Sequence, residues 1–140
     1  MSINFQRAAE KIIRHSGDRT TVGRVGILAI LLGEKQAITH REIEVRLIGK
    51  RRLNRVTLYR VLEWLTERGL VHKIISTDRV WRFRANEDIH LHQHAHFECT
   101  RCTKVICLDD SPARQGWSLP TGYRLQEVEL TVKGLCSQCV

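Results

Sequence analysis

The stretch from residue 90 to residue 107 constrains this chain more than any other. It reads H-L-H-Q-H-A-H-F-E-C-T-R-C-T-K-V-I-C, so four histidines at alternate positions precede a Cys-x-x-Cys pair and a further cysteine. Side chains of a β-strand alternate between its two faces. If the histidine run is extended, its four imidazoles therefore point to one side, and such a density of donors favours a metal-binding site.

Four of the five cysteines form two Cys-x-x-Cys pairs. Cys99 and Cys102 make the first pair, and Cys136 and Cys139 make the second. A turn lets two thiolates occupy neighbouring corners of a tetrahedron, and two pairs complete a four-sulfur site of the kind that holds structural zinc. The alternatives are four reduced cysteines without metal, or a redox pair, although no thioredoxin-like βαβ pattern surrounds either pair.

The remaining candidate ligands are His90, His92, His94, His96 and Cys107. A strand–turn–strand hairpin returns Cys107, on the expected strand 104–108, beside the histidine strand. Imidazole nitrogens together with one thiolate suit zinc better than ferrous iron or manganese. His40 and His72 could each add a ligand from the other half of the chain. A plain surface position is the alternative for every histidine.

Charge divides the chain into a basic part and a near-neutral part. Residues 1–85 hold 18 Lys and Arg against 8 Asp and Glu, and residues 86–140 hold 5 against 7, within a formal net charge of +8. A basic half favours a polyanionic partner such as nucleic acid. A solvated basic surface without such a partner is the alternative.

Length and composition limit the remaining classes of protein. A chain of 140 residues that is 42% hydrophobic suits one domain or two small ones. No apolar run is long enough to span a membrane, and residues 1–6 lack the pattern of a signal peptide. We therefore expect a cytoplasmic protein without membrane contact, whose cysteines are reduced.

Hydrophobic periodicity predicts four helices in the basic part, at 3–15, from 20 or 21 to 33, at 39–48 and at 54–68. Thr39 and Glu42 fit a capping box for the third helix. A basic turn joins the last two helices, which is the arrangement of a helix-turn-helix motif. Tyr59 and Arg60 lie opposite the expected buried stripe of the last helix, and arginine suits guanine edges and phosphates. An ordinary helical hairpin is the alternative.

Two β-prone runs follow at 70–75 and 79–84, separated by the turn residues 76–78. A helix-turn-helix followed by a two-stranded hairpin is a winged helix, and Val80 with Trp81 or Phe83 is expected to close its core. Near the end of the chain, alternation from 123 to 133 predicts a half-buried strand. We predict an α+β chain with a winged-helix DNA-binding domain at 1–84, a hinge at 85–91 and a metal-binding domain at 92–140.

Three stretches together resemble the ferric uptake regulator family. They are R-V-T-L-Y-R-V-L-E-W-L-T-E-R-G-L-V at 55–71, H-x-H-F-E-C-x-x-C-T-K-V-I at 94–106 and G-L-C-S-Q-C at 134–139. The likeness covers nearly the whole chain in the family's order. It implies a homodimeric, metal-dependent transcriptional repressor of palindromic double-stranded operator DNA, with a winged helix and a small C-terminal α/β dimerisation domain that carries a four-cysteine zinc site.

The resemblance also implies roles for single residues. Tyr59 and Arg60 match the family's recognition-helix pair, Arg19 matches a basic residue that reaches the minor groove, and Arg24 matches a further basic position. The paired cysteines match the structural zinc set, and His94 and His96 match two regulatory ligands. The full DNA-binding set that we expect is Tyr59, Arg60, Arg19, Arg24, Arg55, Thr57 and Arg52.

Departures from the iron-type pattern of that family favour zinc as the sensed metal. Cys107 stands where iron-type members have a glutamate, Ala37 where they have a histidine, and Arg84 where a further glutamate ligand is expected. His90 and His92 are extra and can replace missing ligands. We therefore predict one structural zinc ion and at least one regulatory zinc ion per subunit.

The leading hypothesis is a zinc-responsive repressor of zinc-uptake genes. Zinc at the His/Cys site near the hinge would fix the dimer for operator binding. The first alternative is an iron- or peroxide-responsive regulator of the same family. Two others are a zinc hydrolase that uses His94, His96 and Cys107 with Glu98 as its base, and a zinc-stapled interaction module.

Overall fold

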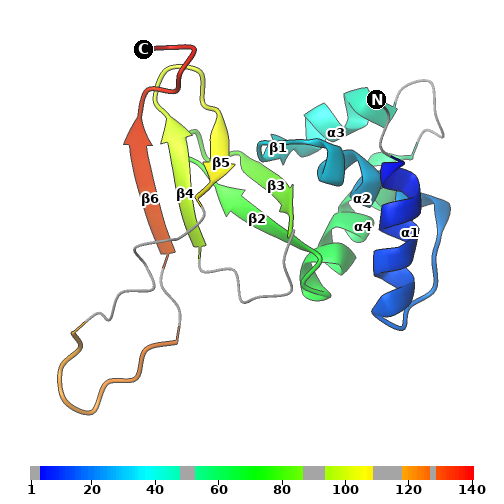
Figure 1. Ribbon diagram of the computed structural model, residues 1–140, viewed down its shortest axis with the longest axis horizontal. Helices are drawn as coiled ribbons and strands as arrows, with labels where there is room; N and C mark the ends of the chain where they lie inside the picture. Colours follow the sequence, from blue (N-terminus) through cyan, green and yellow to red (C-terminus); the bar gives the residue numbers. More distant parts are fainter. Residues whose placement is uncertain (1–3, 48–52, 87–93, 109–117, 127–128) are drawn as a thin grey trace. The chain divides into compact units, whose positions relative to one another are not determined.

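The computed structural model describes residues 4–47, 53–86, 94–108, 118–126 and 129–140, and all of their side chains except those of His94 and Glu129. The chain divides into two units, Met1–Glu87 and Asp88–Val140. Unit 1 contains α1 (Phe5–His15), α2 (Val22–Gly33), β1 (Ile38–Thr39), α3 (His40–Leu47), α4 (Arg55–Glu67), β2 (Val71–Ile75) and β3 (Trp81–Ala85) (Figure 1). Unit 2 contains β4 (His94–Cys99), β5 (Val105–Cys107) and β6 (Glu129–Gly134). The expected α+β class is confirmed.

Polar side chains set the starts of the helices in unit 1. Helices α1, α2 and α4 begin after Asn4, Thr21 and Asn54, and each of these side chains accepts a hydrogen bond from the backbone nitrogen three residues later. At α3 the backbone nitrogen of Glu42 donates to Thr39 Oγ1 (3.2 Å), and that of Thr39 donates to Glu42 Oε1 (3.1 Å). The capping box expected there is therefore present.

One apolar core holds the helices of unit 1 to the strands. Burying a Leu or Ile side chain stabilises a fold by about 1.5–3 kcal/mol, and unit 1 buries many of them completely. The members on the helices come from each apolar stripe, and the sheet adds more. The cluster is Ala9, Ile13, Val25, Ile27, Leu28, Leu31, Ile38, Ile43, Leu47, Leu58, Leu62, Leu65, Val71, Phe83 and Ala85.

The wing is an antiparallel sheet in the order β1-β3-β2. Strands β2 and β3 pair from Val71↔Ala85 to Ile75↔Trp81. Strand β1 pairs with the other edge of β3, and sequence periodicity did not predict it because two residues carry no repeat. Helix α3 begins at His40, immediately after β1.

The expected closure of the core by Val80 is wrong. Val80 is 38% exposed and Trp81 is 44% exposed, whereas Phe83 is buried. Val80 lies beside the turn that precedes β3 and lines an open pocket instead of the core. Of the two residues offered beside Val80, Phe83 therefore closes the core and Trp81 does not.

Asp78 fixes the turn between β2 and β3. Its carboxylate accepts from the backbone nitrogen of Val80 (3.0 Å) and from both terminal nitrogens of the Arg82 guanidinium (3.0 and 2.9 Å). The hydrogen bond from Arg82 is the main cause that lowers the pKa of Asp78. Between these residues Arg79 adopts the left-handed backbone conformation, with φ +62°.

Unit 2 is a sheet in the order β5-β4-β6. Strand β5 runs antiparallel to β4, with His96 opposite Cys107, and β6 runs parallel to β4, with Cys99 opposite Gly134. This pairing carries the chain after Gly134 toward the end of β4. Of the half-buried strand predicted at 123–133, the described residues contain β6 from Glu129 onward, whereas residues 123–126 are not strand. Leu130 is half-buried as expected, but Val132 is 41% exposed in this chain, so its expected burial is wrong. Among the described residues, no helix has the length and apolar character needed to cross a membrane.

Candidate metal centre and nucleic-acid face

Four cysteine sulfurs gather at one end of the unit 2 sheet. Cys99 ends β4 and Cys102 follows in the next turn, while Cys136 and Cys139 follow β6. All four Sγ atoms lie within 4.8 Å of one another, and Cys102 Sγ is 3.7 Å from Cys136 Sγ. The two segments are also joined by a backbone hydrogen bond of 2.8 Å between residues 100 and 134. Four sulfurs this close can close a tetrahedral site without an open position.

The ionisation of these four thiols fits the binding of a divalent ion. The backbone nitrogens of Cys102 and Cys136 lie 3.5 and 3.4 Å from Cys99 Sγ, and their hydrogen bonds, that of Cys102 first, lower the pKa of Cys99 to about 6. The Cys136 side chain is the main cause that raises the pKa of Cys139 to about 12. Neighbouring thiolates repel one another, so four cannot ionise together alone. A soft cation removes this conflict, and the donor set therefore fits zinc.

Strand β5 returns Cys107 to the strand that carries His96, as the hairpin prediction expected. The two residues are cross-strand partners, and a ring nitrogen of His96 lies within 4.8 Å of Cys107 Sγ. His96 is buried, and Cys107 is half-buried. One imidazole and one thiol side by side offer a nitrogen and a sulfur ligand to a metal ion.

The other predicted ligands have different positions. The backbone of His94 begins β4, and His90 and His92 lie outside the described residues. In unit 1, His72 is buried on β2 and its Nδ1 is hydrogen-bonded to Asn86 Oδ1. Helix α3 begins with His40.

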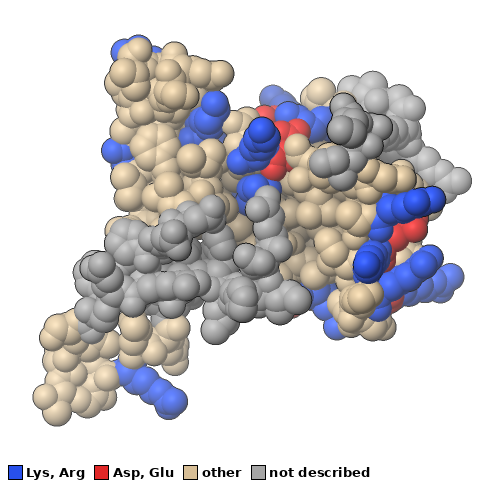
Figure 2. Space-filling model, viewed as in Figure 1, with Lys and Arg blue, Asp and Glu red and all other residues tan. Residues whose placement is uncertain are grey.

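Helix α4 presents its polar side chains opposite its buried stripe. Leu58, Leu62 and Leu65 are buried, whereas Tyr59 is 44% exposed and Arg60 is also exposed. Near the start of the helix, the exposed Arg55 has its Nε 3.6 Å from a carboxylate oxygen of Glu44, and Thr57 is half-buried. On the face drawn in Figure 2, Lys and Arg side chains spread over unit 1, with Asp and Glu among them. Arg52 lies outside the described residues.

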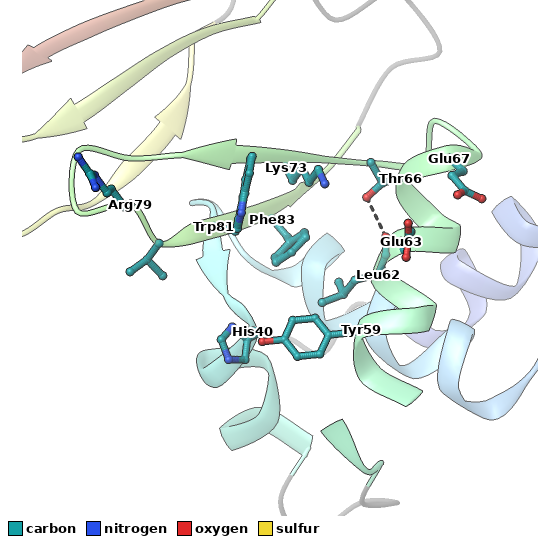
Figure 3. Close-up of a pocket in the computed structure, with 11 residues that line it drawn as sticks. His40, Tyr59, Leu62, Glu63, Thr66, Glu67, Lys73, Arg79, Trp81 and Phe83 are labelled. Carbon is teal, nitrogen blue, oxygen red and sulfur yellow. Dashed lines mark hydrogen bonds between the residues drawn. The ribbon is translucent and has the colours of Figure 1, made fainter. Parts of the chain in front are cut away.

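An open pocket of about 550 Å³ lies between α4 and the β2–β3 wing (Figure 3). Trp81 and Phe83 line it from the strand side, and Leu62 lines it from the helix. At one end the rings of His40 and Tyr59 face each other, with centroids 5.1 Å apart and planes tilted by 40°. Tyr59 therefore packs against His40 while 44% of it stays exposed.

The loop before α2 carries the other predicted DNA contacts. Arg19 is exposed, and its backbone oxygen accepts a hydrogen bond from Arg24 Nη1 (2.8 Å). The Arg24 guanidinium carbon lies 3.7 Å from the centroid of the Trp64 ring, and Arg68 pairs with Asp18 at 3.1 Å. Sequence reasoning missed Trp64, Arg68 and Asp18. The four-residue spacing of Arg60, Trp64 and Arg68, which is the C-cap of α4, is a signal that could have indicated the contact between Trp64 and Arg68.

Known proteins resemble this chain along most of its length. Residues 15–133 match the sequence model of the ferric uptake regulator family. The zinc uptake regulation protein of Escherichia coli (strain K12) is 28% identical over 136 residues, which cover 94% of this chain and 79% of that protein. The ferric uptake regulation protein of Bacillus subtilis (strain 168) is 26% identical over 140 residues, which cover 93% of this chain and 91% of that protein.

A solved structure described as a zinc uptake regulator complexed with zinc and DNA has a similar fold. Its TM-score is 0.69 at 23% sequence identity, and the match covers 98% of this chain and 95% of that one. Relatives named for zinc and for iron are thus similar to this chain to nearly the same degree. The choice of metal therefore depends on the residues of the site.

Proposed function

The chain belongs to the ferric uptake regulator family, and on that premise we propose that it is a zinc-responsive repressor of zinc-uptake genes. Members of this family are dimeric, metal-responsive transcription regulators that bind DNA, and they are not enzymes. The hydrolase interpretation of the His/Cys cluster is therefore set aside. The metal that the chain senses is the part that the proposal adds.

The observation that carries the proposal is the pair formed by His96 and Cys107. Their donor atoms lie within 4.8 Å of each other on adjacent strands. A thiolate beside an imidazole is a borderline-soft donor set, which favours zinc over the oxygen-preferring ions. In this proposal His94 on β4 is a further ligand, and His92 or His90 completes the set.

A second, structural zinc ion belongs to the four-cysteine cluster. In this proposal the ion is held by Cys99, Cys102, Cys136 and Cys139. It exchanges with solvent slowly, because all four coordination positions are filled. Its contribution is folding energy for a small unit, whereas the His/Cys site supplies the response. Each subunit then carries one structural and at least one regulatory zinc ion.

The exposed face of α4 is the DNA-reading surface in this proposal. Tyr59 and Arg60 contact base edges and phosphates, with Arg55, Thr57 and Arg52 nearby and with Arg19 at the minor groove. A dimer that presents two such helices matches a palindrome whose half-sites lie about 34–36 Å apart, or a multiple of that distance. Metal binding by the His/Cys site favours the DNA-competent conformation over the others.

A metal panel tests the proposed specificity. Dimer loaded with zinc at the cysteine cluster alone is titrated anaerobically with buffered Zn(II), Fe(II) and Mn(II). The readout is binding to a duplex that the wild-type protein has selected from a random pool. We expect zinc to promote DNA binding at the lowest free concentration, because both described ligands suit it. Iron promoting binding at an equal or lower free concentration would contradict the proposal and favour the iron-type alternative.

The substitution Cys107→Glu sharpens this test. It supplies the carboxylate that iron-type members have at this position, so the half-saturating concentrations for Fe(II) and Mn(II) should fall relative to that for Zn(II). Ile106→Val is the matched control, because it changes the neighbouring residue on the opposite face of β5 and should leave the metal order unchanged. An unchanged order in Cys107→Glu would remove Cys107 from the sensing site.

A further inference from the structure

We propose that Trp64 is a positioning residue for DNA binding, which holds the loop of residues 16–21 so that Arg19 is presented to the DNA in one conformation. Trp64 acts through two arginines, Arg24 and Arg68, and touches no DNA itself. The inference rests on the DNA-binding role proposed above for Arg19. It also gives Arg24 a different task from the direct DNA contact that its position suggests.

The first observation is the stack of cations on the Trp64 ring. The Arg24 guanidinium lies 3.7 Å from the ring centroid, and the Arg68 guanidinium lies 5.6 Å from it. Tryptophan provides the strongest cation–π partner among the aromatic side chains, and both distances are within the range of that interaction. A half-buried indole on α4 thus orders two arginines that would otherwise sample many rotamers.

Both arginines also contact the loop of residues 16–21. Arg24 Nη1 donates to the backbone oxygen of Arg19 at 2.8 Å, and Arg68 Nη2 lies 3.1 Å from Asp18 Oδ1. The other oxygen of Asp18 accepts from Ser16 Oγ at 3.0 Å. Asp18 is therefore anchored by its side chain to Arg68, and Arg19 is anchored by its backbone to Arg24. Both arginines stack on the Trp64 ring.

The same contacts leave the Arg19 side chain available. It is exposed, and the structure gives its guanidinium no hydrogen bond or ion pair with any described residue. A cationic side chain on an ordered loop has less conformational entropy to lose on binding than one on an unanchored loop. The anchoring contacts therefore favour DNA binding without taking part in it.

The contacts of Trp64 with Arg24 and Arg68 also connect the Arg19 loop to the proposed reading surface on α4. Arg60 and Trp64 on α4 and its C-cap residue Arg68 follow one another at four-residue spacing, so they lie along one side of the helix. Arg60 belongs to the proposed reading surface. The side of the helix that carries Arg60 thus also carries the platform for the Arg19 loop, and the position of the loop relative to the reading surface is set by side-chain contacts.

A double-mutant cycle tests this inference with the zinc-loaded full-length dimer and the selected duplex. Arg19→Ala and Trp64→Leu are each expected to weaken DNA binding about tenfold, as for the loss of one positioned contact. Their combination is expected to be little worse than Trp64→Leu alone, because an unanchored Arg19 contributes little. Trp64→Phe, which keeps an aromatic face, should restore part of the affinity.

Several controls separate positioning from folding. Thr66→Ala changes α4 outside the contacts of Trp64 with Arg24 and Arg68, and it should leave DNA affinity unchanged. If Trp64→Leu alters the far-ultraviolet circular dichroism, Asp18→Asn, which removes the ion pair with Arg68, takes its place in the cycle with Arg19→Ala. The slope of log affinity against log salt concentration should become shallower by about one in both Arg19→Ala and Trp64→Leu.

The outcomes that overturn the inference are distinct from failure of the proposed function. Additive losses in the double mutant, or wild-type affinity in Trp64→Leu, would show that Trp64 does not act through Arg19. Additive losses for Arg24→Ala with Arg19→Ala would return Arg24 to direct DNA contact. Failure of the wild-type protein to enrich any duplex under any metal condition would instead contradict the DNA-binding function itself.

Discussion

Cys107 and Cys99 are both thiols of the unit 2 sheet, yet their surroundings differ. Cys99 is buried among three other cysteine sulfurs and accepts two backbone hydrogen bonds. Cys107 is half-buried beside His96, on the other strand of the β4–β5 pair. The same functional group can therefore serve stability at one position and metal response at the other.

Serine substitutions separate these two roles. We expect Cys107→Ser to give a folded dimer that no longer responds to zinc, because the hydroxyl is a poor replacement for a thiolate ligand. We expect Cys99→Ser to lose structural zinc and unfold unit 2, because the cluster contributes folding energy. Zinc content, near-ultraviolet circular dichroism and DNA binding measure the difference. Identical behaviour of the two variants would contradict the division into structural and sensing sites.

Arg60 is exposed on α4, and in the proposed function it reads a base edge. Replacing it with alanine should weaken binding to the selected duplex by about 1–3 kcal/mol and relax the sequence preference at one position. Fluorescence anisotropy with matched and mismatched duplexes measures both effects. Arg14→Ala, an exposed arginine at the end of α1, is the control. Unchanged affinity in Arg60→Ala removes it from the reading face.

At the scale of single elements, α3 depends on its capping box. Thr39→Ala removes the side-chain acceptor for the Glu42 backbone nitrogen and should destabilise unit 1 by about 1 kcal/mol. For a domain of this size that corresponds to a fall of about 4–8 °C in melting temperature. Thr39→Ser keeps the acceptor and should melt close to the wild type. Equal melting of all three proteins in calorimetry would show that the cap contributes no stability.

Local sequence signals predicted the helices better than they predicted the contacts between them. The buried stripe of α4 follows from its apolar spacing, and the start of α3 follows from Thr39 and Glu42. Strand β1 and the exposure of Val80 depend on how the wing meets the helices, which no short window contains. The Trp64 platform likewise joins α4 to a loop more than 40 residues away in sequence.

The site was predictable to a similar extent. The expected strand–turn–strand hairpin placed Cys107 beside the histidine strand, and the two Cys-x-x-Cys pairs indicated the cysteine cluster. The pKa of Cys99 depends on backbone nitrogens of Cys102 and Cys136, whose direction is set only by the folded turns. Sequence spacing gives ligand types, whereas the order of ionisation among them is a property of the fold.

At the scale of the whole molecule, the two units draw stability from different sources. Unit 1 has a continuous apolar core and contains every helix of the described residues, whereas unit 2 is a three-stranded sheet with the cysteine cluster at its end. A strong zinc chelator should therefore abolish the tertiary signal of unit 2 while most helical circular dichroism remains. Loss of the helical signal in parallel with zinc release would show that the units do not fold independently.

The most direct test of zinc-responsive repression is the reciprocity between zinc and DNA. Coupling between two ligands requires that each raises the affinity for the other by the same factor. Zinc is titrated into dimer that already holds its structural zinc, once alone and once with saturating selected duplex, and DNA affinity is measured with and without regulatory zinc. We predict equal increases in both directions, of about 5–150-fold, in the wild type and no coupling in Cys107→Ser. Equal DNA affinity with and without zinc at this second site would contradict the account.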